Sequence, residues 1–259
     1  MKRYSLLNLL LLALLPLAAH AQDSKVIRFG VDPTYPPFES KAPDGTLVGF
    51  DIDLGNAICA NLHARCVWVE QSFDAMIPAL QARKFDAILS AMSATAVRKQ
   101  QIDFTDKIYN GPSRLVAATG STLVPEAASL KGKRIGVDQG SMQETFAKAE
   151  WAPQGVTVIS YPTQDAIYQD LTTGRLDGAF QSAVQADIGF LKTPRGKGYS
   201  FAGEEVKDKR VAGDGVAIGV RKDNTALAAK LNTGIAAIRH DGTYNRLAHK
   251  YFDFNIYGD

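Results

Sequence analysis

The 259-residue sequence is poor in the residues and motifs that enzymes and metalloproteins use. It has four histidines and two cysteines, and it lacks the G-x-S-x-G, H-E-x-x-H and P-loop motifs. His63, His240 and His249 are predicted in helical or surface settings, away from strand ends. No group of residues supplies an acid, a base and a nucleophile together. We therefore expect no catalytic residue, no bound metal and no cofactor.

Long apolar runs are confined to the N-terminus. Lys2 and Arg3 precede a leucine-rich stretch over 6–17, and Ala19-His20-Ala21 follows it. The run is shorter than a membrane span, and the small residues around His20 fit a cleavage site. The sequence predicts a signal peptide over 1–21, cleaved after Ala21, and a periplasmic protein.

The sequence also lacks an excess of charge. Without Lys2 and Arg3 the 29 basic residues fall to 27, which equals the 27 acidic ones. A balanced chain has no basic face for nucleic acid, so no nucleic-acid partner is expected.

Two cysteines, Cys59 and Cys66, lie seven positions apart. An even count in an exported chain favours one disulfide. A metal site is the alternative, but two cysteines without a nearby histidine pair do not provide four ligands.

Strand-like and helix-like segments alternate along the chain. This pattern predicts an α/β fold with largely parallel sheets. Strands are expected at 25–32, 66–71, 85–90, 134–138, 156–161 and 176–181, and helices at 50–63, 73–84, 142–151 and 164–174.

Two pairs of segments resemble each other. "RFGVD" (28–32) matches "RIGVD" (134–138), and "RKFDAILS" (83–90) resembles "GRLDGAFQ" (174–181). The alternative is chance similarity, but the order of the pairs is preserved. The repeat predicts two lobes of similar plan and aligns Asp32 with Asp138 and Ala91 with Ser182.

Ligands of open α/β sheets bind beyond the carboxyl ends of the strands. That rule places Asp32, the 90–93 run, Asp138 with Gly140-Ser141, and Gln181-Ser182 around one opening. The sequence therefore predicts a cleft between the lobes.

The stretch "LSAMSATAVR" (89–98) passes through Ser90, Ala91 and Ser93 before it reaches Arg98. One interpretation is a helix cap followed by a surface arginine. The other is a carboxylate site, because short side chains expose backbone N–H groups and a guanidinium binds two oxygens at once.

Aromatic and capping residues surround the same predicted cleft. Tyr35 in "DPTYPPF" lies near Asp32, which suits a cationic group, and Phe73 is a candidate second wall. The alternatives are a packed loop and a hydrophobic staple at a helix start. Ser141 and Glu144 form a capping box at a helix N-terminus, which can also bind an anion.

Together these segments resemble the periplasmic polar-amino-acid-binding proteins of ABC importers, especially the lysine/arginine/ornithine- and histidine-binding group. The stretches that carry the resemblance are "DPTYPPF", "GFDIDLGNAIC", "FDAMIPALQARKFDAILSAMS", "LKGKRIGVDQGSMQE", "GRLDGAFQ", "KDKR" and "DGTYNRLAHKYFDFNIYGD". The resemblance implies a type II periplasmic-binding fold, in which each lobe has a mixed, mostly parallel sheet flanked by helices. Lobe 1 would comprise 22–109 and 216–259 and lobe 2 114–206, with hinge strands at 110–113 and 207–215.

The resemblance also implies roles for individual residues. Arg98, with Ser93 and Ser141, would bind the ligand carboxylate beside Ser90 and Ala91. Asp32 and Gln143 would hold the distal cationic end, Tyr35 and Phe73 would form aromatic walls, and Cys59 would pair with Cys66.

The chain departs from the family pattern at three positions. The family usually has an aspartate for the ligand α-ammonium where this chain has Ser182, an apolar residue at Asp138, and often a serine at Ala91. Opine-binding members, whose ligands carry a substituted α-nitrogen, also lack that aspartate. Either the ligand nitrogen is substituted or missing, or the negative charge has moved to Asp138. On this basis we hypothesise that free lysine or arginine is not the tightest ligand.

The resulting expectation is a monomeric receptor for a cationic amino acid or a derivative such as an opine, which delivers its ligand to an inner-membrane ABC permease. The alternatives are a periplasmic enzyme on the same fold, similar to cyclohexadienyl dehydratase, and a partner of a sensor or chemoreceptor.

Overall fold

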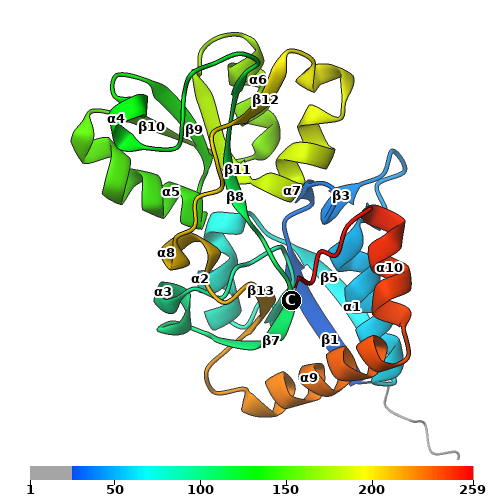
Figure 1. Ribbon diagram of the computed structural model, residues 1–259. Helices are drawn as coiled ribbons and strands as arrows, with labels where there is room; N and C mark the ends of the chain where they lie inside the picture. Colours follow the sequence, from blue (N-terminus) through cyan, green and yellow to red (C-terminus); the bar gives the residue numbers. More distant parts are fainter. Residues whose placement is uncertain (1–24, 259) are drawn as a thin grey trace, which may run out of the picture.

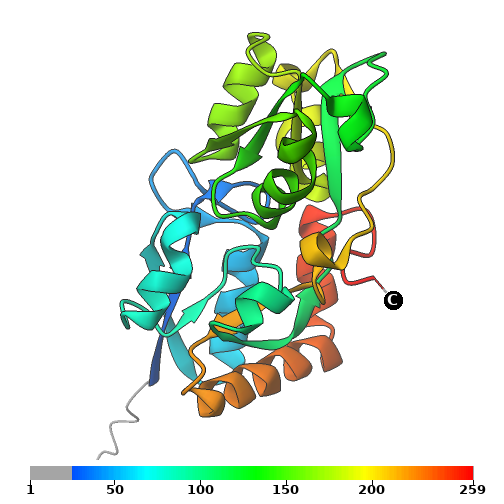
Figure 2. The ribbon, with the colours of Figure 1, turned by 90° about the vertical axis from the view of Figure 1, so that its left-hand side faces the viewer.

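The computed structural model describes residues 25–258, so the predicted signal peptide and its cleavage after Ala21 lie outside the described residues. Two five-stranded sheets, each flanked by helices, form two lobes that lie one above the other in both views (Figures 1 and 2). We call the lobe built on the first sheet lobe 1 and the other lobe 2. Among residues 25–258, no helix has the length and apolar character that a membrane span requires.

The sheet of lobe 1 has the strand order β5-β1-β6-β13-β7. Strand β1 pairs in parallel with β5 and β6, whereas β13 pairs antiparallel with β6 and β7. The strands are β1 (Lys25–Val31), β5 (Ala64–Glu70), β6 (Ala87–Ile88), β7 (Asp103–Tyr109) and β13 (Val216–Val220).

The sheet of lobe 2 repeats this plan in the order β10-β9-β11-β8-β12, with two parallel and then two antiparallel pairings. The α/β class and the mixed sheets are as expected, but parallel pairings are half of the total rather than most of it. The reason is that β13 and β8 each enter their sheet from the other lobe and run against their neighbours. The strands are β8 (Ser113–Ala118), β9 (Arg134–Asp138), β10 (Thr157–Tyr161), β11 (Gly178–Ser182) and β12 (Tyr199–Ala202).

The internal repeat is visible in matching hydrogen bonds. The backbone N–H of Arg28 donates to the Asp86 carboxylate at 3.0 Å, and that of Arg134 donates to Asp177 at 2.8 Å. Each arginine Nε donates to the same carboxylate as its own backbone N–H. In each lobe, therefore, the same arginine–aspartate interaction links two adjacent parallel strands.

The packing against these strands also repeats. A Cβ added at Gly30 would lie 2.5 Å from the Phe85 ring, and one added at Gly136 would lie 2.5 Å from Leu176. Both glycines occupy the third position of the repeated "R-x-G-V-D" segment. A large apolar side chain fills the space that each glycine leaves, which explains why the repeat includes this residue.

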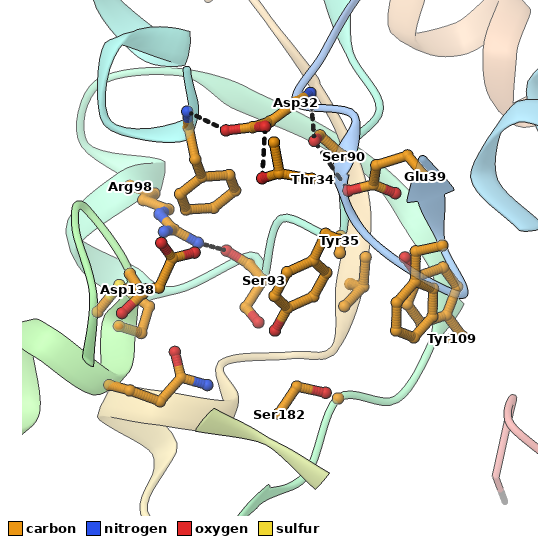
Figure 3. A pocket seen from close by; sticks show the side chains of 18 residues that line it. Asp32, Thr34, Tyr35, Glu39, Ser90, Ser93, Arg98, Tyr109, Asp138 and Ser182 are labelled. Atoms are coloured by element: carbon orange, nitrogen blue, oxygen red, sulfur yellow. Dashed lines mark hydrogen bonds between the residues drawn. The ribbon is translucent and has the colours of Figure 1, made fainter. Parts of the chain in front are cut away.

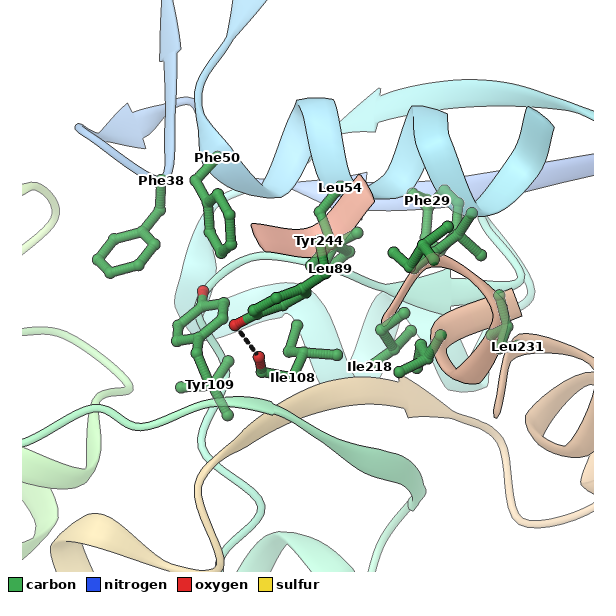
Figure 4. Close-up of a cluster of buried hydrophobic side chains, with 14 of the residues drawn as sticks. Phe29, Phe38, Phe50, Leu54, Leu89, Ile108, Tyr109, Ile218, Leu231 and Tyr244 are labelled. Atoms are coloured by element: carbon green, nitrogen blue, oxygen red, sulfur yellow. Dashed lines mark hydrogen bonds between the residues drawn. The ribbon is translucent and has the colours of Figure 1, made fainter. Parts of the chain in front are cut away.

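Helices cover both faces of the lobe 1 sheet. Helices α1 (Phe50–Asn61), α9 (Thr225–His240) and α10 (Thr243–Tyr251) pack on one face, where Phe29, Phe50 and Leu231 are buried (Figure 4). Helix α2 (Met76–Gln81) packs on the other face through Met76 and Leu80.

Strand β8 shows why lobe 2 also needs helices on both faces. Leu115 and Ala117 belong to one buried cluster, and Val116 between them belongs to the other. Successive side chains of a strand point to opposite faces, so an unbroken apolar run needs cover on both sides. That cover comes from α4 (Ala127–Leu130) and α5 (Met142–Phe146) on one face and α6 (Gln164–Thr172) and α7 (Ala183–Ala186) on the other.

The chain passes between the two sheets from β7 to β8 and again from β12 to β13 (Figure 1). Helix α8 (Lys209–Ala212) lies in the second passage. These passages overlap the predicted hinges at 110–113 and 207–215, whose role in movement stays a prediction. The remaining elements lie around the interlobe region: α3 (Ala96–Lys99) and a small sheet of β2 (Thr34–Tyr35), β3 (Glu39–Lys41) and β4 (Leu47–Val48).

The expected disulfide is present and joins Cys59 in α1 to Cys66 in β5. We predict that the double substitution Cys59→Ala, Cys66→Ala lowers the free energy of unfolding by about 2 kcal/mol, because the unfolded chain regains the freedom of the short loop. Urea unfolding of oxidised wild type and the variant measures this loss. Fully reduced wild type is the matched control, and equal stability of oxidised and reduced protein would contradict the prediction.

Candidate ligand-binding site

A cavity lies between the two lobes. All eleven side chains that the sequence predicted for the ligand site line it (Figure 3). They are Asp32, Tyr35, Phe73, Ser90, Ala91, Ser93 and Arg98 from lobe 1 and Asp138, Ser141, Gln143 and Ser182 from lobe 2.

Three residues expected at the opening do not line the cavity: Met92, Gly140 and Gln181. Gln181 is buried behind it, where its Oε1 accepts a hydrogen bond from the Tyr168 hydroxyl at 2.9 Å. The expectation for Gln181 failed because successive strand residues face opposite ways, so Ser182 and Gln181 cannot both point to the cleft.

Arg98 is the buried cation of the site. Its side chain stands over the Phe73 ring, and the residue is 6% exposed. Its Nη1 donates to the Ser93 carbonyl and its Nη2 to the Gly140 carbonyl, each at 3.1 Å. Burial lowers its pKa to about 10, and within residues 25–258 it forms no salt bridge. A buried guanidinium held by neutral carbonyls has the charge and the free N–H donors to bind an anion.

The helix cap expected in the 89–98 stretch is present, and the carboxylate site stays a prediction. Thr95 caps α3 and accepts a hydrogen bond from the Arg98 N–H at 3.4 Å, as a helix cap does. Arg98 itself, however, turns into the interlobe cavity rather than to the surface.

Asp51 fixes the backbone on which the short side chains stand. Ala91 has a φ of 48°, a left-handed conformation that costs energy for an alanine. Its N–H donates to Asp51 Oδ2 at 2.8 Å, and the Tyr109 hydroxyl donates to Oδ1 at 2.8 Å. Asp51 is fully buried and does not line the cavity, so it acts as a positioning residue.

Glu39 and Ser90 connect this network to the first strand end. The Ser90 hydroxyl donates to Glu39 Oε1 at 3.0 Å and accepts from the Asp32 N–H at 3.0 Å. Burial, and then the negative charge of Asp51, raise the pKa of Glu39 well above its ordinary value. Burial beside Asp51 therefore favours the neutral form of Glu39.

Asp32 is held as a fixed carboxylate at the end of β1. Its Oδ1 accepts from the Thr34 hydroxyl and its Oδ2 from the Phe73 N–H, both at 2.8 Å. The residue is 7% exposed, and burial raises its pKa. Tyr35 and Phe73 line the same cavity, which gives the carboxylate the aromatic neighbours expected from the sequence.

Lobe 2 presents helix starts to the cavity. Ser141 Oγ accepts from the Glu144 N–H at 3.0 Å, as the predicted capping box requires, whereas Glu144 Oε2 accepts from the Gly140 N–H at 2.7 Å rather than from that of Ser141. Ser182 caps α7 in the same way. Gln143 Nε2 donates to the Ser113 hydroxyl at 2.8 Å, so its amide has a fixed orientation.

The two lobes touch around the cavity, so the structure is a closed form. Arg98 of lobe 1 bonds to Gly140 of lobe 2, and Gln139 Nε2 of lobe 2 donates to Asp74 of lobe 1 at 2.9 Å. On another side Gly189 lies against Pro36, where an added Cβ would be 2.9 Å from the Pro36 carbonyl oxygen.

Several lining residues were not among the predicted ones. Tyr109 precedes the first predicted hinge, Gly111 lies within it, and Val216 follows the second. The rule that crossing segments border the cleft would have found all three. Phe38 is both core and cavity wall, because it is buried and stacks on Tyr109 at 5.0 Å. The lining residues missed in this way are Thr34, Phe38, Glu39, Tyr109, Gly111, Met142 and Val216.

Two α/β lobes of repeated plan that close over a cavity define a binding protein with the type II periplasmic-binding fold, as the sequence predicted. A solved Salmonella typhimurium periplasmic binding protein, described as having high arginine specificity, matches with a TM-score of 0.81 and 32% identity, over 88% of this chain and 99% of that one. Residues 27–254 match the model of the bacterial extracellular solute-binding proteins, family 3. The chain belongs to this family.

Two curated relatives match over nearly their whole length. The lysine/arginine/ornithine-binding periplasmic protein of Escherichia coli is 51% identical over 98% of this chain and 99% of its own. The histidine-binding periplasmic protein of Salmonella typhimurium is 53% identical over 93% of each chain. These relatives are binding proteins and not enzymes, so this chain is a solute-binding protein and the dehydratase alternative is set aside.

Closure around Gly189 generates a prediction. An alanine there would press its Cβ against the Pro36 carbonyl of the other lobe, and it would be free of that contact in an open form. Overpacking of this kind costs about 1–3 kcal/mol, so we expect Gly189→Ala to weaken ligand binding by roughly five- to a hundredfold. Calorimetric titration measures the affinity, and solution scattering follows whether ligand still reduces the radius of gyration.

The same experiment distinguishes closure from general damage. The added Cβ would also lie 2.9 Å from Gln185 Nε2 of the same lobe, in the open and the closed form alike. Thermal unfolding of ligand-free Gly189→Ala therefore measures the loss due to that contact, and the loss of affinity reports the contact with Pro36. Unchanged affinity with normal compaction would contradict the role of this contact.

Asp138 generates a pH prediction. Burial, and then the negative charges of Asp32 and Glu144, raise its pKa to about 8 in the closed form. A raised pKa stabilises the closed form at low pH, and that stabilisation is lost as the pH rises toward about 8. We therefore expect ligand-free Asp138→Asn, which cannot ionise, to populate the closed form more than wild type does near pH 8. Solution scattering across pH should show a smaller radius of gyration for the variant near pH 8 and no difference near pH 4, whereas a pH-independent difference would contradict the prediction.

Proposed function

We propose that this protein is a periplasmic receptor for a cationic amino acid of the arginine, lysine, ornithine and histidine class, or for a derivative. The observation that carries this proposal is the pairing of opposite charges in one cavity. Arg98 offers a buried guanidinium without a salt bridge among the described residues, and Asp32 offers a fixed carboxylate. The names of the relatives support the same ligand class.

The ligand carboxylate binds Arg98, whose guanidinium can serve two oxygens at once. Ser93 and the N-terminal turn of α5 at Ser141 add hydrogen-bond donors on the two sides of that anion. Because the carbonyls of Ser93 and Gly140 already orient Arg98, little ordering remains to be done when the ligand arrives.

The distal end of the ligand lies toward Asp32, with Gln143 as a further polar contact. Tyr35 and Phe73 pack against its alkyl or planar part, where a ring face also attracts positive charge. The ligand thus contacts both lobes and stabilises the closed form, since its binding energy is realised fully when the lobes meet.

The closed, loaded receptor delivers its ligand to an inner-membrane ABC permease. This assignment follows from the resemblance and from membership of the solute-binding family. It implies export to the periplasm after cleavage of the signal peptide behind Ala21, and a monomeric receptor.

Calorimetric titration of the purified protein with arginine, lysine, ornithine and histidine tests the proposal. We expect at least one of these to bind, and we expect Arg98→Ala to lose about 2–5 kcal/mol of binding free energy, because the ligand carboxylate would be buried without its partner.

Glutamine is the control ligand for the cationic end, because it retains the carboxylate and the α-ammonium but has a neutral side chain. Absence of binding to all four basic amino acids would overturn the proposed ligand class. A loss below about tenfold, or 1.4 kcal/mol, in Arg98→Ala would overturn the carboxylate site.

A further inference from the structure

We propose that Asp138 is the counter-charge for the α-ammonium group of the ligand, so that the cavity selects free basic α-amino acids over opines. This inference rests on the proposed function and adds a contact between the α-ammonium of the ligand and Asp138. It also decides between the two explanations that the sequence left open for Ser182.

The first argument is the charge balance of the cavity. Arg98 is the one arginine or lysine among the described residues that line it, and three carboxyl groups line it as well: Asp32, Glu39 and Asp138. Glu39 is occupied by Ser90, and burial beside Asp51 favours its neutral form. Asp32 and Asp138 therefore face one guanidinium, and a ligand cation beside Asp138 would lower the pKa that burial raises, so that both can be carboxylates in the loaded cavity.

This balance specifies the charges of the ligand. A ligand with one carboxylate and one cation would leave a carboxylate unpaired in a closed cavity, which is costly. A ligand with one carboxylate and two separate cationic groups pairs every charge. Free basic α-amino acids, with an α-ammonium and a cationic side chain, have this pattern.

The second argument is the position of Asp138 relative to Arg98. Asp138 ends β9, and the carbonyl of Gly140, two residues later, accepts from Arg98 Nη2 at 3.1 Å. Figure 3 shows the Asp138 side chain on the Arg98 side of the cavity. In an α-amino acid the ammonium stands on the carbon that bears the carboxylate, so a carboxylate held by Arg98 brings the ammonium to the Asp138 side.

The neighbouring residues do not provide this charge. Asp32 lies at the end of the other lobe's equivalent strand, where Thr34 and the Phe73 N–H hold it. Ser182, on the adjoining strand β11, presents a neutral hydroxyl that caps α7. Asp138 is therefore the carboxylate that lobe 2 contributes to the described cavity wall.

The same geometry disfavours an opine. An opine carries a second carboxylate on its α-nitrogen, and that group would face Asp138 without a second cationic side chain in the described lining. Arginine should therefore bind more tightly than octopine, an opine derived from it. This expectation is the opposite of the hypothesis drawn from the sequence, that free lysine or arginine is not the tightest ligand, and the titrations below distinguish the two.

The test uses three ligands that differ by one charge. Arginine has both cationic groups, 5-guanidinopentanoic acid lacks the α-ammonium, and citrulline lacks the charge of the side chain. Asp138→Asn is compared with wild type and with the matched variant Asp32→Asn at about pH 8, by calorimetric titration. Binding of the spared ligand shows that each variant is folded.

We expect Asp138→Asn to weaken arginine and citrulline by about thirtyfold or more, since each loses the partner of a buried charge, and to change 5-guanidinopentanoic acid by less than about threefold. Asp32→Asn should show the opposite selectivity and spare citrulline. Adding Ser182→Asp to Asp138→Asn should recover part of the arginine affinity, because it returns a carboxylate to the same wall.

Equal losses for all three ligands in Asp138→Asn would overturn the proposal, because the effect would not depend on the ligand's charge. Losses for arginine and 5-guanidinopentanoic acid but not citrulline would also overturn it and place Asp138 with Asp32 at the distal cation. Tighter binding of octopine than of arginine to wild type would overturn the selectivity. If wild type binds none of the basic amino acids, the proposed function fails first, and the two failures are distinguishable.

Discussion

The buried guanidinium of Arg98 is the constraint on which the site depends. It comes from lobe 1, yet it bonds to a carbonyl of each lobe, Ser93 and Gly140, and so connects the two halves of the closed protein. These carbonyls orient the group without neutralising it, so its charge remains uncompensated within the described residues. An arginine that is desolvated in this way gains most from an anion that arrives between the lobes. Ligand binding and closure are therefore two aspects of one electrostatic interaction.

Behind the cavity wall, a second buried network fixes the groups that the ligand meets. Asp51 holds the Ala91 N–H in a left-handed turn, and burial beside Asp51 favours the neutral form of Glu39. The network joins the ends of two strands through Ser90 and leaves Asp32 as an ionisable acceptor that faces the cavity. Lobe 1 thus has one carboxyl group, Asp51, behind the cavity wall and another, Asp32, in the wall itself. This separation lets a site that is rich in carboxyl groups bind a molecule that itself carries a carboxylate.

Much of this arrangement could be predicted from the sequence, because the chain contains an internal repeat and because its strand ends mark the cleft. The repeated "R-x-G-V-D" segments revealed two lobes because Arg28 and Arg134 make the same bonds to Asp86 and Asp177. The rule for strand ends then located the cavity and seven of the eleven predicted residues. The other four were predicted from the aromatic residues, the 89–98 stretch and the family resemblance: Tyr35, Phe73, Arg98 and Gln143. Asp51 could not be found in this way, because an aspartate at the start of a helix is common. Its contact with the site is a hydrogen bond from the Ala91 N–H, 40 positions later in the chain. The proportion of parallel strands was also wrong, since local pattern does not show that β8 and β13 cross from the other lobe.

The repeat also has a consequence for specificity. Duplicated lobes place equivalent residues on opposite walls of one cleft, so Asp32 and Asp138 are two copies of one position that face the same ligand. Two like charges in one closed cavity repel each other, and that repulsion contributes to the raised pKa of Asp138. The repulsion is relieved when positive charge lies between the walls, which a free basic amino acid supplies at two points. The symmetry of the fold therefore creates an excess of negative charge that a dicationic ligand would balance. Arg98 has no counterpart of the same charge in the aligned repeat segments, so the proposed ligand would bind with its carboxylate at one end of the cavity, beside Arg98.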